Sequence, residues 1–280
     1  MPVTLRLWLG ESLRWYLIRA KHPLKGYLVG HFWSWFCKPR LWIRYDTDAA
    51  ITVCLRDYLQ QRIFFDRAYE RPLLDWLARE LRPDDVFWDV GANIGAVTLF
   101  ASGRCRRVVA FEPDPRSLSL LRQHVDVNRR TNVEIVPAAL GEEPGRATLH
   151  QAPAANTGMT TLMTGRVRAD VPQVDVRVER ADDLLAASRY ERPNIIKMDV
   201  EGAEHLVLRG ATKLLASGSV RAIAFEDRRS SDGTPANAAL AACLSDAGYV
   251  VDFVVPSDEK LDDGMANFVA VPKGARRASP

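Results

Sequence analysis

Residues 86–95, VFWDVGANIG, together with residues 108–114, VVAFEPD, decide how this chain folds. Val86 and Val90 belong to an apolar run that predicts a buried strand, and this strand leads into a glycine-bearing turn. A helix is expected to start near Ile94, and the second stretch predicts another strand, which ends on a carboxylate. A strand, a glycine loop, a helix and a second strand with an acid are typical of one nucleotide-binding βαβ half.

The residues of this loop narrow the choice of nucleotide. Gly91 and Gly95 have no Cβ, so the backbone can turn tightly and a ligand can approach closely. The dinucleotide pattern G-x-G-x-x-G is absent, because Asn93 stands where its second glycine would be. Asp89 suits a ligand with an ammonium group, and Glu112, 21 residues after Gly91, can accept both hydroxyls of a ribose. S-adenosylmethionine (SAM) has both groups, so we predict a SAM site; the alternative is an ordinary turn with a surface acid.

Three motifs in this order carry a family resemblance, namely DVGANIG at 89–95, FEPDP at 111–115 and IIKMDVEGAE at 195–204. Together they resemble the FkbM-type SAM-dependent methyltransferases, over about residues 69–271. The resemblance implies an α/β fold of the Rossmann-like class I methyltransferases, with a seven-stranded, mostly parallel sheet and helices on both faces. It also implies O-methylation of a hydroxyl on a glycan, glycolipid or secondary metabolite, and it leaves the acceptor open.

Acidic residues follow four of the predicted core strands. The carboxyl ends of such strands meet at one rim, where like charges repel, so a cluster of acids there indicates a site. We assign Asp89 to the methionine ammonium, directly or through water, and Glu112 to the ribose. Asp199 is the first candidate for the base that takes a proton from the acceptor. Glu226 and His205 come next, although His205 also fits an ordinary position in the first turn of a helix.

Further residues complete the predicted site. Lys197, in an apolar strand, is expected to pair with a core carboxylate or to orient the acceptor. Glu70 corresponds in the resembling family to a position near the methionine end of the cofactor, but it also suits a plain helix start, where the dipole favours an acid. The small residues Ala138 and Ala139 leave room for adenine. The predicted cofactor contacts also include Asp199 and the loop residues Gly91, Ala92, Asn93, Gly95 and Pro113.

A divalent cation is an alternative to a lone base. Asp199 and Glu226 could share a hard cation that lowers the pKa of a hydroxyl. No third ligand is evident beside them in the sequence, so a divalent metal stays an alternative that we do not favour, and we assign no residue to a metal. The acceptor is then a small molecule or glycan that loses its proton to a side chain.

We divide the chain into an N-terminal extension at 1–68, a SAM-binding domain at 69–274 and a basic tail at 275–280. Apolar residues at helical spacing predict helices over 4–20 and 24–36, and alternation predicts a hairpin over 41–55. Residues 1–44 contain eight Lys or Arg and one Glu, whereas the remainder has a net charge of −4. Two interpretations of this aromatic and basic extension stay open. It is a helical cap on the domain or on a second subunit of a homodimer, or it contacts a membrane or glycolipid peripherally.

The second half of the domain predicts further elements. Alternation over 147–151 and 174–178 predicts two additional strands, and the polar segment 152–164 between them is a candidate lid or substrate loop, or else a plain surface loop. Helices are expected over 71–81, 116–129, 182–187, 203–217 and 234–247, and a final strand pair over 249–255 and 267–271.

The composition and the absence of certain motifs limit the functions that this chain can have. The four cysteines have no C-x-x-C spacing, which indicates free thiols rather than a zinc site. The sequence has neither an apolar run that could span a membrane nor a recognisable leader, so we expect a cytoplasmic or membrane-peripheral location. The absence of an N/D-P-P-Y motif argues against methylation of nucleic-acid bases, and we expect no nucleic-acid partner. N-methylation of a small molecule and a non-catalytic SAM-binding protein remain alternatives.

Overall fold

The computed structural model describes residues 3–19, 40–46, 48–68, 70–152, 160–163, 171–255 and 264–275. Its centre is a seven-stranded sheet in the order β11-β12-β10-β9-β3-β4-β5. The strand β12 runs antiparallel to β10 and β11, and the other neighbours are parallel, which confirms the predicted Rossmann-like sheet. The strands are β3 (Val86–Val90), β4 (Arg107–Phe111), β5 (Val133–Val136), β9 (Ile195–Met198), β10 (Ala222–Arg228), β11 (Tyr249–Val255) and β12 (Met265–Pro272).

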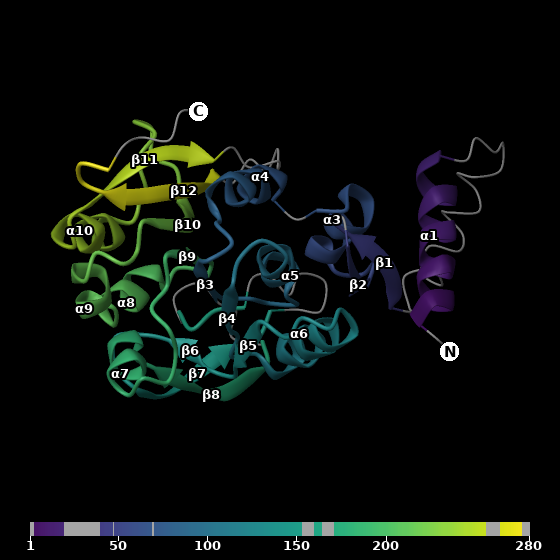
Figure 1. Ribbon diagram of the computed structural model, residues 1–280, viewed down its shortest axis with the longest axis horizontal. Coiled ribbons are helices and arrows are strands. Elements are labelled where there is room, and N and C mark those ends of the chain that lie inside the picture. Colours follow the sequence, from purple (N-terminus) through teal and green to yellow (C-terminus); the bar gives the residue numbers. More distant parts are fainter. Residues whose placement is uncertain are drawn as a thin grey trace.

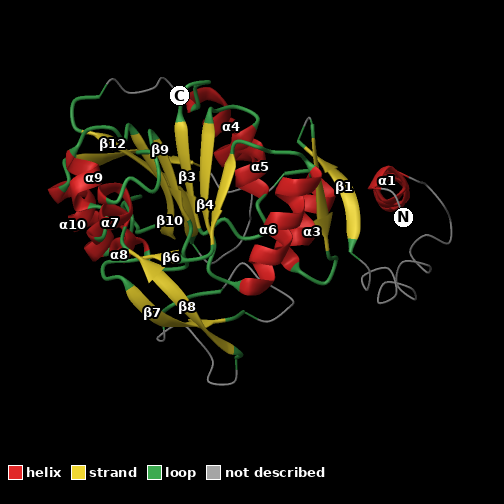
Figure 2. Ribbon diagram, turned by 60° about the horizontal axis from the view of Figure 1, so that its bottom comes forward, coloured by secondary structure: helices red, strands yellow, loops and turns green. Residues whose placement is uncertain are grey.

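Helices cover both faces of this sheet (Figure 2). Side chains alternate along each strand, so Phe87 joins the hydrophobic cluster on one face and Trp88 joins the cluster on the other. The first face carries α4 (Arg71–Glu80), α5 (Ala96–Ser102) and α6 (Pro115–Val127). The second face carries α7 (Ala181–Ala186), α8 (Glu204–Arg209), α9 (Thr212–Ala216) and α10 (Ala238–Asp246).

The N-terminal extension adds further layers outside α5 and α6 (Figure 1). The predicted hairpin is confirmed as β1 (Leu41–Tyr45) and β2 (Ala49–Val53), followed by α3 (Tyr58–Asp66). The backbone N–H of Thr52 in β2 donates to Nε2 of His124 in α6 over 2.9 Å, and this bond ties the hairpin to the domain. Helix α1 (Val3–Arg19) packs on the outer side of β1. The predicted helix over 24–36 lies outside the described residues.

Two helix predictions are wrong in their extent. The expected helix over 203–217 is divided into α8 and α9 at Gly210 and Ala211. The backbone N–H groups of Lys213 and Leu214 donate to the carboxylate of Asp182, each over 2.9 Å, and so begin α9 separately. The helix expected from residue 234 begins only at α10. There the side-chain oxygen of Asn237 accepts from the backbone N–H groups of Ala239 and Leu240, over 3.1 and 3.2 Å.

The two predicted additional strands are confirmed in a separate sheet. The strands β6 (Ala139–Leu140), β7 (Gly145–His150) and β8 (Gln173–Glu179) form it in the order β6-β8-β7. Of the candidate lid loop over 152–164, residues 153–159 and 164 lie outside the described part of the chain. No helix among the described residues is long and apolar enough to cross a membrane.

Candidate active site

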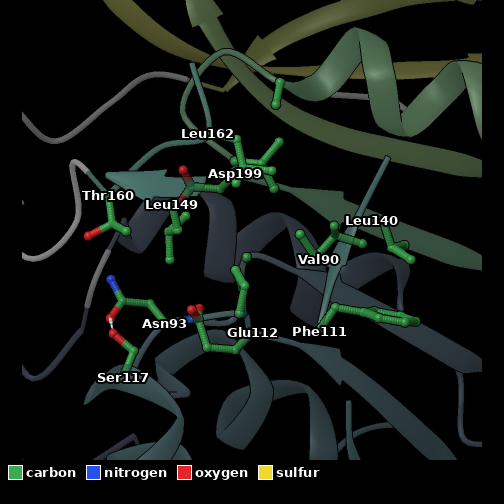
Figure 3. Close-up of a pocket in the computed structure, with 15 residues that line it drawn as sticks. Val90, Asn93, Phe111, Glu112, Ser117, Leu140, Leu149, Thr160, Leu162 and Asp199 are labelled. Carbon is green, nitrogen blue, oxygen red and sulfur yellow. Dashed lines mark hydrogen bonds between the residues drawn. The ribbon is translucent and has the colours of Figure 1, made fainter. Parts of the chain in front are cut away.

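A pocket opens at the carboxyl ends of β3, β4 and β9, where the sequence places its motifs (Figure 3). The small sheet closes one side of it through Ala139, Leu140 and Leu149. The loop after β3 and the start of α6 supply polar atoms to its wall. Its lining residues are Val90, Gly91, Asn93, Phe111, Glu112, Pro113, Ser117, Ala139, Leu140, Leu149, Thr160, Leu162, Asp199, Val200 and Ala203.

The turn after β3 requires glycine at residue 91 for two reasons. Gly91 has φ +81°, a left-handed conformation that side chains disfavour. A Cβ at this position would also lie 1.9 Å from the carbonyl oxygen of Asp199 at the end of β9. The backbone N–H groups of Gly91 and Ala92 both donate to the carbonyl oxygen of Phe111, each over 3.0 Å, so the loop is held between two neighbouring strands.

Asn93 and Glu112 hold the loop and the end of β4 together. The backbone N–H of Asn93 donates to one carboxylate oxygen of Glu112 and that of Asp114 donates to the other, both over 2.7 Å. The Asn93 side chain accepts from the hydroxyl of Ser117 over 3.1 Å (Figure 3). Burial raises the pKa of Glu112 to about 7, although the two backbone N–H groups act to lower it. Each carboxylate oxygen keeps acceptor capacity toward the pocket, and ribose hydroxyls could use it.

Asp89 lies beneath the pocket and not on its wall. Its side chain points to the face of the sheet that carries α5, where the hydroxyl of Thr98 donates to it over 2.6 Å. Asp89 is fully buried, and its other oxygen lies 3.6 Å from Nζ of Lys197. The structure therefore places the predicted ammonium ligand out of direct reach, because the strand's alternation turns Asp89 away from the pocket side of Val90.

Lys197 joins the loop that follows β3 to the end of β9, and it forms the buried ion pair that the sequence predicts. Its Nζ atom donates to the carbonyl oxygen of Gly91 over 3.1 Å and lies 3.3 Å from the carboxylate of Asp199. Burial acts to lower the pKa of Lys197, but the nearby carboxylates of Asp199 and Asp89 outweigh it and hold that pKa above its usual value. The side chain therefore stays charged.

Three carboxylates gather beyond Asp199. Oxygen atoms of Asp199, Glu201 and Glu226 lie within 4.8 Å of one another. Burial, followed by the negative charges of Asp199 and Glu70, raises the pKa of Glu226 well above its usual range. The third possible cation ligand, not evident from the sequence, is thus Glu201, which has φ +54° and which the sharp turn after β9 brings back toward the cluster.

Of the two predicted residues Glu70 and His205, Glu70 lies near the charged groups of the site and His205 does not line the pocket. The Glu70 carboxylate accepts from the side-chain amide of Asn267 in β12 over 2.8 Å and caps no N–H group of α4. It lies close enough to Lys197 and Glu226 to influence the pKa of each, so it belongs to the same charged neighbourhood. His205 neither lines the pocket nor joins the three carboxylates; its carbonyl oxygen faces Cys243 of α10 over 3.9 Å.

Some of the remaining predicted cofactor contacts line the pocket, and the others are buried behind its wall. Ala139 and Pro113 line the pocket, whereas Ala138 and Ala92 are buried outside its lining. Gly95 lies against α6, since a Cβ there would come 2.5 Å from the side chain of Leu121. Phe111, Leu149 and Leu162 form an apolar wall of the pocket that the sequence does not predict. Apolar residues in strands and loops carry no sequence signal that distinguishes a pocket wall from the core.

The residues that line this pocket lie within a match to a known family. The family model described as the methyltransferase FkbM domain matches residues 89–251, which include the loop, Glu112, Asp199 and Glu226. This chain belongs to the FkbM methyltransferase family. The match covers the strands that form the pocket and excludes the N-terminal extension.

The alignments with curated relatives include about half of this FkbM-family chain. Hexuronic acid methyltransferase AglP of Haloferax volcanii is 31% identical over 150 residues, which are 53% of this chain and 59% of the relative. The 31-O-demethyl-FK506 methyltransferase FkbM of Streptomyces tacrolimicus is 33% identical over 181 residues, 55% of this chain and 67% of the relative. A solved structure of methyltransferase FkbM from Methylobacillus flagellatus has a TM-score of 0.47 at 20% identity, covering 76% of this chain and 52% of that one.

Proposed function

We propose that this protein is a SAM-dependent O-methyltransferase that uses Glu226 as the base for its acceptor hydroxyl. The proposal rests on Asp199, which belongs both to the pocket wall and to the cluster of carboxylates. This residue lines the cofactor pocket and also lies within 4.8 Å of the carboxylates of Glu201 and Glu226. A pocket for a nucleoside and a proton acceptor therefore adjoin at one residue.

The residues of the pocket fit SAM. Glu112 has acceptor capacity for the ribose hydroxyls, and the apolar side chains of Leu140 and Leu149 suit a flat adenine ring. Asp199 is the carboxylate on the wall that the methionine ammonium can reach, and it takes the role that the sequence assigned to Asp89. SAM supplies an electrophilic methyl group, and the protein must align the acceptor and remove its proton.

Glu226 is better suited to proton removal than Asp199. The Asp199 carboxylate is ion-paired with Lys197 and is thereby held in place beside the loop that follows β3. Burial and neighbouring carboxylates raise the pKa of Glu226 well above its usual range, so this carboxylate binds a proton more strongly than an ordinary glutamate does, as a general base requires. Glu226 therefore takes the proton of the acceptor, and Asp199 orients the reacting groups.

The acceptor belongs to the class of hydroxyl-bearing glycans, glycolipids and secondary metabolites. The names of three relatives support this class: a hexuronic acid methyltransferase, a 31-O-demethyl-FK506 methyltransferase and a 2-O-methyltransferase, NoeI of Sinorhizobium fredii, which is 27% identical over 149 residues. The NoeI match covers 48% of this chain and 60% of the relative. These acceptors differ from one another, so the relatives support the chemistry of the acceptor more than its identity.

A two-stage experiment tests the proposal. First, SAM should raise the unfolding temperature of the purified protein, because a ligand that binds the folded state stabilises it. Second, methyl-labelled SAM is incubated with the protein and separate glycan, lipid and metabolite fractions. Label that mild alkali releases indicates a methyl ester. Label that survives alkali is then located by mass spectrometry of the product, where a methyl group on oxygen is expected and one on nitrogen would contradict the proposal. A protein that shows no SAM-dependent stabilisation, or that labels only carboxyl groups, contradicts the proposal.

A further inference from the structure

Helix α1 is apolar on two opposite faces. Its inner face packs on β1, where Gly10 is so close to Trp42 that a Cβ would lie 1.9 Å from the carbonyl oxygen of Trp42. Leu17 extends this contact to the main hydrophobic cluster. Five other large apolar side chains of this helix are exposed to solvent. The exposed ones are Leu5 at 44%, Trp8 at 65%, Leu9 at 46%, Trp15 at 62% and Ile18 at 39% exposure.

Polar contacts hold α1 in this orientation. The guanidinium group of Arg14 donates to the carbonyl oxygens of Phe64 and Phe65 at the end of α3, over 2.6 and 2.7 Å. The carboxylate of Glu11 pairs with Arg67 and accepts from the backbone N–H of Arg44 over 2.8 Å. The inner face is thus fixed to the hairpin and to α3, and α1 lies on the side of the hairpin that faces away from the central sheet (Figures 1 and 2).

Charge indicates what this outer face meets. Residues 1–44 contain eight Lys or Arg and a single Glu, whereas the rest of the chain has four more acidic than basic residues. On α1 itself, Arg6 and Arg19 are exposed. Tryptophan favours the boundary between headgroups and acyl chains, and Arg next to it can meet anionic headgroups. Two copies of so basic a segment repel each other, which disfavours a second copy as the partner.

We propose that the outer face of α1, made by Leu5, Trp8, Leu9, Trp15 and Ile18, docks on an anionic lipid surface. The apolar side chains enter the headgroup boundary while the helix lies in the plane of the surface. The net negative charge of the catalytic domain is repelled by the same lipids, so the molecule binds with α1 toward the membrane. This inference is independent of the methyl-transfer proposal, because it rests on a layer outside the FkbM domain match.

Flotation of the full-length protein with lipid vesicles tests the docking. We expect the protein to float with vesicles of phosphatidylcholine and phosphatidylglycerol at low salt and to stay behind with phosphatidylcholine alone. High salt should reduce the floated fraction, because it screens exposed charges. The double variant Trp8→Ser, Trp15→Ser should bind anionic vesicles about tenfold more weakly than the wild type, since each substitution removes a large apolar side chain from the boundary.

A matched control removes exposed apolar side chains elsewhere. Val250→Ser with Val251→Ser changes residues of β11 that are 42% and 37% exposed, and it should leave flotation unchanged. Equal unfolding midpoints of both double variants establish that each is folded. The proposal is overturned if the wild type fails to float with anionic vesicles, or if both double variants float like the wild type. It is also overturned if light scattering shows a dimer that the tryptophan substitutions dissociate while no vesicles are bound.

Discussion

The Nζ atom of Lys197 lies 3.1 Å from the carbonyl oxygen of Gly91, so a buried cation of β9 holds the cofactor loop that follows β3. The same atom lies 3.3 Å from Asp199 and 3.6 Å from Asp89, one carboxylate on the pocket wall and one beneath it. Lys197 is thus a positioning residue: it sets the loop and the orienting carboxylate at a fixed separation before any ligand binds.

Removing this cation should destabilise the fold. Lys197→Met leaves the fully buried Asp89 without its counter-charge, and breaking a buried pair on one side costs about 3–5 kcal/mol of unfolding free energy. Urea unfolding measures this loss. The double variant Lys197→Met, Asp89→Asn should recover part of it, because Asn can still accept from Thr98 and carries no charge. A double variant no more stable than Lys197→Met would show that the ion pair is unimportant.

The contact of Gly91 with Asp199 predicts a large effect of a single methyl group. Gly91→Ala combines a left-handed backbone with a clash against a carbonyl oxygen, and we expect a loss of more than about 3 kcal/mol. Gly218→Ala is the matched control, because Gly218 also has positive φ, +72°, but nothing within 4 Å of its Cβ position. That variant should lose only about 1–2 kcal/mol. Equal losses in thermal unfolding would contradict the steric account of the loop.

Cofactor binding should depend on pH through Glu112. The ionised carboxylate accepts ribose hydroxyls, and its pKa of about 7 means that it is mostly protonated at acidic pH. SAM affinity should therefore rise with pH, by about tenfold from one unit below that pKa to well above it. Calorimetric titration of Glu112→Gln, which cannot ionise, should give weaker binding that is constant over this range. A wild-type affinity that is flat with pH would remove Glu112 from the ribose.

Turnover should follow the ionisation of Glu226. Because a base acts only when deprotonated, kcat/KM should rise as the pH increases through the elevated pKa of Glu226 and then level off. Glu226→Gln should reduce turnover by about 10²–10⁴-fold while SAM still raises the unfolding temperature. Asp199→Asn should weaken both, since Asp199 lines the pocket and adjoins the base. S-adenosylhomocysteine release provides the readout, and an active Glu226→Gln enzyme would transfer the base role elsewhere.

Metal removal distinguishes the base from a cation. The oxygens of Asp199, Glu201 and Glu226 are close enough to share an ion, but the proposed proton transfer uses Glu226 alone. Protein treated with EDTA and then desalted should keep its full rate. Loss of the rate, followed by its recovery with Mg²⁺ or Mn²⁺ but not with NaCl, would assign the three carboxylates to a metal.

The sequence predicts the core strands and the cofactor loop well, for a local reason. Gly91 and Gly95 interrupt runs of apolar residues, and both turn signals and strand runs are read from neighbours along the chain. Helix ends are predicted less well. The separate start of α9 depends on Asp182, a residue distant in the sequence whose carboxylate meets Lys213 and Leu214 only in the folded molecule.

For the site as well, some features can be predicted from the sequence and others depend on the tertiary structure. The sequence by itself determined the family, the loop and the acids at the strand ends, because residue type and order along the chain carry that information. Tertiary structure alone decided that Asp89 is buried under Lys197 and that Glu201 joins Asp199 and Glu226. It also decided that α1 keeps a second apolar face outward. Burial and carboxylate separation depend on which elements pack together, and these distances set each group's charge and reach.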